Sequence, residues 1–100
     1  MDQDSLPVVS VITPSFNRVD LLPTTLNSVL AQSYGLFEYL IVDDGSTDGT
    51  WEWLNSVDDP RVKIFSHPGR ENRGQAASIN LGLRYASGRY VVILDSDDLL

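Results

Sequence analysis

The chain of 100 residues contains no cysteine, which excludes disulfide bonds and thiolate chemistry. It also lacks basic runs: seven Lys and Arg stand against 14 Asp and Glu, a net charge of −7 at pH 7. We therefore expect no nucleic acid partner and no attraction to anionic lipid. No apolar run is long enough to cross a bilayer, and Met1 to Asp4 are acidic where a secretory leader is basic. We expect a cytoplasmic protein. For the full-length protein, a location at the inner face of the membrane is also consistent with this expectation.

Two nucleotide-binding signatures are also missing. There is no Gly-x-Gly-x-x-Gly and no glycine-rich loop with a phosphate-binding lysine, which argues against a dinucleotide fold and a P-loop enzyme. Hydrophobic residues make up 42% and charged residues 21%, which is typical of a globular domain, and the length allows one small domain. The chain stops at Leu100, directly after a group of acids, so we expect residues 1–100 to be part of a longer protein.

Four short runs of β-branched and large apolar residues predict strands at residues 8–13, 37–42, 61–65 and 90–94. Pro14 is expected to end the first strand, because proline cannot donate a hydrogen bond to a neighbouring strand. The third run alternates polar and apolar residues, as expected of an edge strand. The fourth is apolar throughout, which predicts a strand buried on both faces.

Three helices are expected between these strands. The first is predicted to begin at Asp20 as its N-cap and to end at Gly35, and the second to begin near Thr47 or Asp48. The third follows Gly74. The predicted inward-facing positions are Leu22, Leu26, Val29 and Leu30 in the first helix, Trp51 and Leu54 in the second, and Ala76, Ile79, Leu83 and Ala86 in the third.

Alternation of strands and helices with short connections predicts an α/β, Rossmann-like parallel sheet with helices on its faces. Right-handed crossovers place every strand's carboxyl end at one edge, where ligands bind in open sheets. The expected strand order is 3-2-1-4. The residues that follow the strands therefore meet at a single edge.

Three carboxylates follow the fourth strand, in Asp95-Ser96-Asp97-Asp98. Carboxylates in such close succession need a cation, protons or solvent between them. Their oxygens are the ligands that Mg²⁺ or Mn²⁺ prefers, and successive residues of an extended segment point to opposite sides. Asp95 and Asp97 are therefore candidates for a shared divalent ion. A solvated acidic turn is the alternative.

Two other strand ends carry candidate site residues. Asp43 and Asp44 follow the second strand, where carboxylates are either turn residues or acceptors for a nucleobase or ribose. Phe16, in the loop after the first strand, either stacks on a base or packs on the first helix. Arg73 and Arg70 precede the third helix, and the sequence leaves open which of them meets an anion.

Four segments together resemble the family-2 glycosyltransferases of the GT-A fold. They are residues 8–18, 42–50, 72–74 and 93–98, and they occur in the order and at the spacings of that family. The resemblance implies transfer of a sugar from a nucleoside-diphosphate sugar, most often UDP-linked, with inversion at the anomeric carbon. It also implies a role in cell wall or polysaccharide biosynthesis, with a glycan or lipid-linked saccharide as acceptor. A homodimer is expected for a different reason, because the open edge of the predicted sheet can pair with another chain.

The resemblance further implies the roles of individual residues. Thr13 to Asn17 and Asp44 would hold the uracil and ribose, Asp95 would lie near the ribose and metal, and Asp97 would bind Mg²⁺ or Mn²⁺. The expected substrate-binding residues are Thr13, Pro14, Ser15, Phe16, Asn17, Asp43, Asp44, Arg73 and Asp95, and the expected metal ligands are Asp95 and Asp97.

This sequence departs from the family at one residue, and it does not contain the family's acceptor-binding half. Ile79 stands before Asn80 where many members have arginine. The family's catalytic base lies downstream of the Asp-x-Asp, so residues 1–100 would be a nucleotide-sugar-binding subdomain, inactive without the acceptor-binding half. The alternatives are a non-catalytic nucleotide-binding module and a phosphatase of the haloacid-dehalogenase type.

Overall fold

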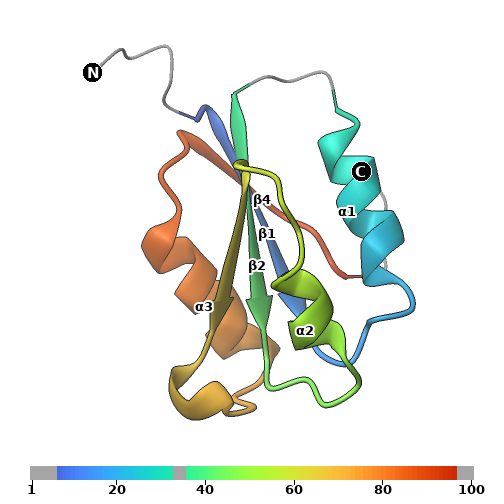
Figure 1. Cartoon of the computed structure of the whole chain (residues 1–100). Coiled ribbons are helices and arrows are strands. Elements are labelled where there is room, and N and C mark those ends of the chain that lie inside the picture. The colour runs from blue at the N-terminus through green and yellow to red at the C-terminus, as the bar shows by residue number, and fades with distance from the viewer. Residues whose placement is uncertain (1–6, 33–35, 97–100) are drawn as a thin grey trace.

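A computed structural model describes residues 7–32 and 36–96. Its four strands are β1 (Val9–Ser15), β2 (Phe37–Asp43), β3 (Val62–Ser66) and β4 (Tyr90–Ile93). They form one parallel sheet in the order β3-β2-β1-β4, so the predicted order 3-2-1-4 is confirmed. Figure 1 shows the carboxyl ends of the strands at one edge of this sheet.

β1 runs two residues further than predicted and includes Pro14, which pairs with Val42 of β2. The prediction that Pro14 ends the strand is therefore wrong. The even-numbered residues toward the end of β1 turn their backbone groups toward β4, as shown by the bond from Leu94 N to the Ile12 carbonyl at 2.9 Å. The pairing with β4 ends at Ile12 and Ile93, so no bond between these strands needs the missing N–H of Pro14.

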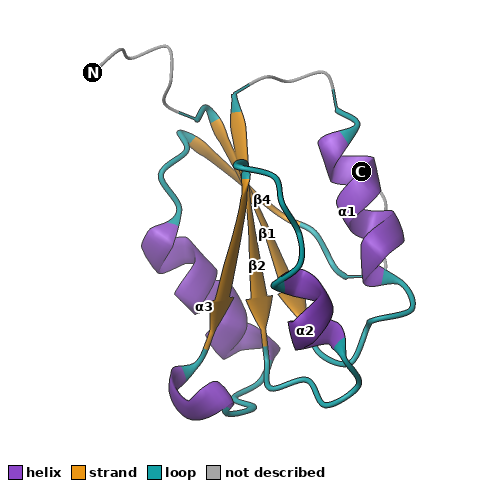
Figure 2. Cartoon of the chain, viewed as in Figure 1, coloured by secondary structure: helices purple, strands orange, loops and turns teal. Residues whose placement is uncertain are grey.

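Helices α1 (Leu22–Leu30) and α2 (Thr50–Leu54) cover one face of the sheet, and α3 (Gln75–Tyr85) covers the other (Figure 2). The first helix does not begin at Asp20: its N-cap is Leu21, whose side chain makes no capping bond. Proline falls within the first turn, where its missing N–H has no cost. Gly35, the predicted end of this helix, lies outside the described residues.

The second helix begins at Thr50, later than predicted. Asp48 precedes the helix and bonds to its first residue. Asp48 Oδ1 accepts hydrogen bonds from the backbone N–H of Thr50, at 3.0 Å, and from its hydroxyl. Burial raises the pKa of Asp48, but these bonds and one from Val19 outweigh burial and lower it. Asp48 is therefore placed just outside the helix. A 3₁₀ turn, η2 (Pro68–Arg70), follows β3.

The packed face of α3 differs from the predicted stripe. Its buried residues are Ser78 and Gly82, whereas Ala76 and Leu83 are exposed. A side chain at position 82 would lie 2.6 Å from Ile12 Cγ2, so the missing side chain lets the helix approach β1. Small residues on this face allow α3 to lie close to the sheet.

The main core lies between the sheet and the two helices α1 and α2, which cover one of its faces. Its buried members are Val11, Leu22, Leu26, Val29, Phe37, Tyr39, Ile41, Leu54 and Leu94. β4 was predicted to be buried on both faces, which is wrong here, because all four of its side chains are exposed by 37–60%. The strand forms an edge of the sheet and pairs only with β1 among the described strands.

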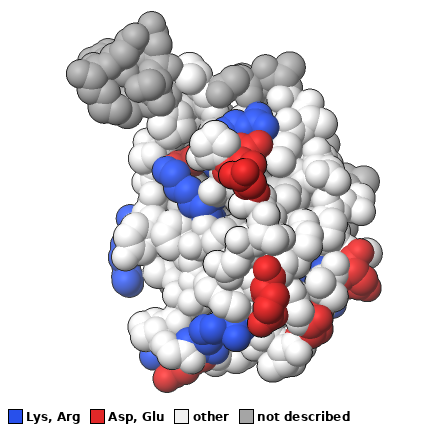
Figure 3. Space-filling model, in the orientation of Figure 1, with Lys and Arg blue, Asp and Glu red and all other residues white. Residues whose placement is uncertain are grey.

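Charged side chains of both signs lie over the surface shown in Figure 3, which has no continuous basic patch among its coloured residues. Within residues 7–32 and 36–96, no helix is both long and apolar enough to cross a membrane.

Candidate functional site

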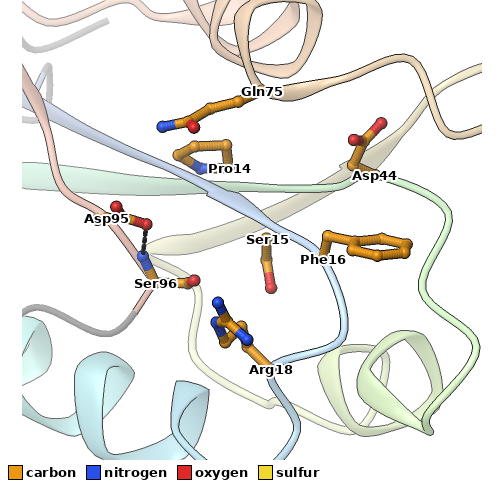
Figure 4. Close-up of a pocket in the computed structure, with 8 residues that line it drawn as sticks. All are labelled: Pro14, Ser15, Phe16, Arg18, Asp44, Gln75, Asp95 and Ser96. Carbon is orange, nitrogen blue, oxygen red and sulfur yellow. Dashed lines mark hydrogen bonds between the residues drawn. The ribbon is translucent and has the colours of Figure 1, made fainter.

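A cavity of about 270 Å³ opens at the carboxyl edge of the sheet. The end of β1, the loops after β1 and β2, the start of α3 and the segment after β4 form its walls (Figure 4). The residues that line it are Pro14, Ser15, Phe16, Arg18, Asp44, Gln75, Asp95 and Ser96. The structure thus brings together five predicted site residues: Pro14, Ser15, Phe16, Asp44 and Asp95.

Asp44 is fixed in this wall by the start of α3. Its Oδ1 accepts hydrogen bonds from the backbone N–H of Arg73, at 2.6 Å, and of Gly74, at 3.2 Å; Oδ2 accepts one from Gly74 at 2.9 Å. The carboxylate also benefits from the positive end of the helix dipole. The backbone N–H of Asp44 donates to the Ser15 carbonyl at 2.8 Å, which ties the residue to β1. Asp44 is therefore a rigid acceptor at the cavity wall.

Asp43 has a different position. It is fully buried and does not line the cavity; its Oδ2 accepts hydrogen bonds from Ser46 N at 3.1 Å and from Arg70 at 3.4 Å. Arg70 also donates to the Ser46 carbonyl at 2.8 Å, and its guanidinium lies 5.0 Å from the centre of the Trp51 ring. This arginine, which follows β3, is therefore held against the loop that follows β2.

Arg73 does not line the cavity either. Its half-exposed side chain forms an ion pair with Glu71 at 2.9 Å, and only its backbone N–H reaches Asp44. The arginine on the cavity wall is Arg18, which the sequence showed only as a cation in the loop after the first strand. Gln75 and Ser96 were also missed, since neither residue type signals a site by itself.

Thr13 and Asn17 support the site without lining the cavity. Thr13 is fully buried, and its hydroxyl lies 2.7 Å from the Tyr39 hydroxyl. Burial raises the pKa of Tyr39 to about 12, although the hydrogen bond with Thr13 acts in the opposite direction. Asn17 Oδ1 accepts a bond from Thr47 N at 2.7 Å, and its own backbone N–H donates to Ser46 Oγ at 2.9 Å. These bonds join the loops after β1 and β2.

The segment after β4 supplies the last wall. Asp95 Oδ1 accepts a hydrogen bond from Ser96 N at 2.8 Å, and the Ser96 carbonyl accepts one from Thr25 Oγ1 at 2.7 Å. This contact to α1 holds the segment beside the cavity. Asp97, the other predicted metal ligand, lies outside the described residues, among which no group of three His, Cys, Asp or Glu side chains is placed to hold a metal. The carboxylate of Asp95 is the donor type that Mg²⁺ and Mn²⁺ accept, so this wall offers one ligand of the required kind.

The sequence is similar to glycosyltransferases. It is 48% identical over 92 residues to a Bacillus subtilis protein named as a glycosyltransferase of teichuronic acid biosynthesis, covering 92% of this chain and 36% of that one. It is 38% identical over 93 residues to an Escherichia coli protein, WfaP, named as a UDP-Glc:alpha-D-GlcNAc-diphosphoundecaprenol beta-1,3-glucosyltransferase, covering 93% of this chain and 36% of that one. The chain thus spans about a third of the length of these relatives.

Solved structures with the same architecture support this similarity. The Pyrobaculum calidifontis mannosyltransferase PcManGT, in complex with GDP-Man and Mn²⁺, matches with a TM-score of 0.81 and 35% identity over 94% of this chain and 28% of that one. S. aureus TarS, in complex with UDP-GlcNAc, matches with a TM-score of 0.83 and 32% identity over 91% of this chain and 27% of that one. The sheet order and the flanking helices are those of the GT-A fold.

The model of the family described as "Glycosyl transferase family 2" matches residues 10–100, which include every described strand and helix except the first residue of β1. The chain belongs to glycosyl transferase family 2.

Proposed function

We propose that this chain is the donor-binding half of an enzyme that transfers a sugar from a UDP-sugar to an acceptor, with inversion at the anomeric carbon. The acceptor would be a glycan or a lipid-linked saccharide in cell wall or polysaccharide biosynthesis. The observation that carries the proposal is the cavity at the carboxyl edge, with Asp44 held rigidly in its wall. The UDP-glucose donor in the name of the Escherichia coli relative WfaP and the UDP-GlcNAc bound to TarS agree with this chemistry.

Asp44 and Phe16 would receive the base. Asp44 Oδ2 accepts only one hydrogen bond among the described residues, from Gly74, so it has a lone pair for the N–H of a uracil. The side chain of Phe16 is 45% exposed at the same wall and offers a flat apolar face on which a base can stack. A rigid acceptor beside an exposed ring is suited to a planar base that carries an N–H group.

Asp95 lies across the cavity from Asp44, in the direction that the ribose and phosphates would take (Figure 4). We propose that Asp95, together with Asp97, holds Mg²⁺ or Mn²⁺ at this wall. When bound, such an ion supplies Lewis-acid stabilisation of the charge on the departing diphosphate. The chain's own residues would bind and orient the donor, while the catalytic base would come from the acceptor-binding half, so the chain alone would not transfer sugar.

Calorimetric titration with UDP in the presence of Mn²⁺ tests the proposal. Asp44→Ala should weaken binding by about 1.5–3 kcal/mol, the value of a hydrogen bond to a charged group. Asp58→Ala, a change of the same charge at an exposed position away from the cavity, is the matched control and should leave the affinity unchanged. Equal affinities of wild type and Asp44→Ala would remove Asp44 from the site.

The metal part has its own test. UDP affinity of the wild type should fall when a chelator replaces Mn²⁺, and Asp97→Asn should lose most of that difference. A diphosphate is repelled by neighbouring carboxylates unless a cation lies between them. Tighter UDP binding by Asp97→Asn both with Mn²⁺ and with chelator would contradict the metal site, because it would show carboxylates that only repel the nucleotide.

A further inference from the structure

We infer that Arg18 and Ser15 form the diphosphate-binding wall of the cavity, an inference that rests on the proposed function and assigns its phosphate contacts. Arginine is well suited to this role, since its guanidinium presents several N–H donors to phosphate oxygens. Neither Arg73 nor Arg70 can take the role in the described conformation, because each is held by an acidic partner outside the cavity.

Arg18 is fixed at its backbone and presents its side chain to the cavity. Its N–H donates to Thr50 Oγ1 at 3.1 Å, and its carbonyl accepts hydrogen bonds from the N–H groups of Leu21, at 3.1 Å, and Leu22, at 2.8 Å. These contacts anchor the residue between α2 and the start of α1. In Figure 4 the guanidinium of Arg18 points toward Ser15 and Ser96. The backbone of Arg18 is therefore held at a defined place, while its exposed side chain lines the cavity.

Ser15 supplies an independent observation. It is only 1% exposed, and its Oγ has no hydrogen-bond partner among the described residues, although it belongs to the cavity wall. Burial of a hydroxyl without a partner is unfavourable, because the group loses its hydrogen bonds to water. A ligand oxygen in the cavity would accept the hydroxyl's hydrogen bond and remove this cost. Ser15 thus behaves as a group that is completed by a ligand.

The charges of the wall agree with this placement. Arg18 is the only cation among the described residues that line the cavity, beside the two carboxylates of Asp44 and Asp95. The Asp44 charge is already stabilised by two backbone N–H groups. A nucleotide with its base near Asp44 and its phosphates toward Asp95 therefore needs a positive group on the path between them. In Figure 4, Arg18 lies below that path, together with Ser15.

The test compares uridine, UMP and UDP as ligands for the wild-type chain and for Arg18→Ala, Arg18→Lys and Ser15→Ala. Arg18→Ala should weaken UDP binding roughly tenfold or more, while uridine binding changes less than about twofold, because only UDP carries the diphosphate. Arg18→Lys keeps the charge but not the planar donor set and should lie between wild type and Arg18→Ala. Arg89→Ala, an equal charge change at the opposite end of the sheet, is the control and should bind UDP as the wild type does.

Ser15→Ala separates a ligand contact from a structural defect. It should weaken UDP binding about three- to tenfold without lowering the thermal midpoint, since it removes a buried hydroxyl that has no protein partner. Unchanged UDP affinity in Arg18→Ala, or an equal loss for uridine and UDP, would overturn the role of Arg18. Unchanged UDP affinity in Ser15→Ala would remove Ser15 from the wall. If the wild type failed to bind UDP while remaining folded, the proposed function itself would fall, and this inference with it.

Discussion

The imidazole Nε2 of His67 lies 3.0 Å from the hydroxyl oxygen of Ser78. Both residues are buried: His67 directly follows β3, and Ser78 lies on α3. The same nitrogen lies 3.5 Å from Asp44 Oδ1. One ring thus joins the end of β3, the packed face of α3 and the carboxylate assigned to the base. It acts behind the cavity wall and does not line it.

A double-mutant cycle measures this contact. We expect His67→Ala to lower the free energy of unfolding by about 1–3 kcal/mol and Ser78→Ala by about 0.5–1.5 kcal/mol, because each leaves a buried polar group without its partner. The double variant should lose about 0.5–1.5 kcal/mol less unfolding free energy than the sum of the two single losses. Urea unfolding gives all four values, and strictly additive losses would show that the two side chains do not interact.

Glu38 predicts acid sensitivity. It is buried near the start of β2, and it accepts hydrogen bonds from Lys63 at 2.7 Å, Ser10 at 2.6 Å and the Ser87 N–H at 2.7 Å. Burial raises its pKa, but these bonds outweigh burial and lower the pKa to about 2, from an ordinary value of 4.5. A depressed pKa in the folded state gives stability that is complete above about pH 4.5 and is lost as the pH falls toward 2.

We therefore expect Glu38→Gln to be less stable than wild type by about 2–3 kcal/mol at pH 7, with the difference shrinking below pH 4.5. Urea unfolding at pH 7, 4 and 2.5 measures the effect. Glu52→Gln, an exposed position on α2, should match wild type throughout. If the stability difference between wild type and Glu38→Gln stayed constant down to pH 2.5, the lowered pKa of Glu38 would be contradicted.

Gly45 is expected to be irreplaceable in the loop that carries Asp44. Its φ is +76°, and a Cβ there would lie 2.9 Å from Asn72 N and 3.0 Å from the Arg70 carbonyl oxygen. Gly45→Ala should cost at least about 2 kcal/mol, since left-handed strain is joined by a backbone clash. Gly49→Ala is the control, with φ +98° and no atom within 4 Å, and should cost less. Equal thermal shifts would show that the close approach to residues 70–72 carries no energy.

The exposed β4 predicts self-association. Its apolar side chains are 37–60% exposed on an edge strand, and such edges pair with other chains. We expect the scattering mass of the chain to rise above the monomer value as its concentration approaches millimolar, and Ile93→Lys to reduce that rise. Leu83→Lys, at an equally exposed apolar position on α3, should leave the association as in wild type. A clean monomer at millimolar concentration would contradict the prediction.

The errors in the element predictions share a cause: the type of a residue does not specify which residues lie beside it in the fold. Pro14 lies inside β1 because β4 has already stopped pairing there, and α3 packs through Ser78 and Gly82 because the helix lies close to Ile12. The apolar sequence of β4 predicted burial, but no described element covers this strand. Local composition cannot specify what lies across an interface.

The order and spacing of the residue patterns are enough to specify the architecture and the region of the site. Alternating strand and helix patterns with short connections allow few parallel sheets, and right-handed crossovers place the strand ends together. Which side chains face the cavity was decided by tertiary contacts. Arg73 pairs with Glu71 and Asp43 is buried beneath its loop, while Arg18 and Ser15 face the cavity. The direction of an arginine depends on contacts with residues distant in the chain, such as the bond from Arg18 N to Thr50, and residue spacing does not encode those contacts.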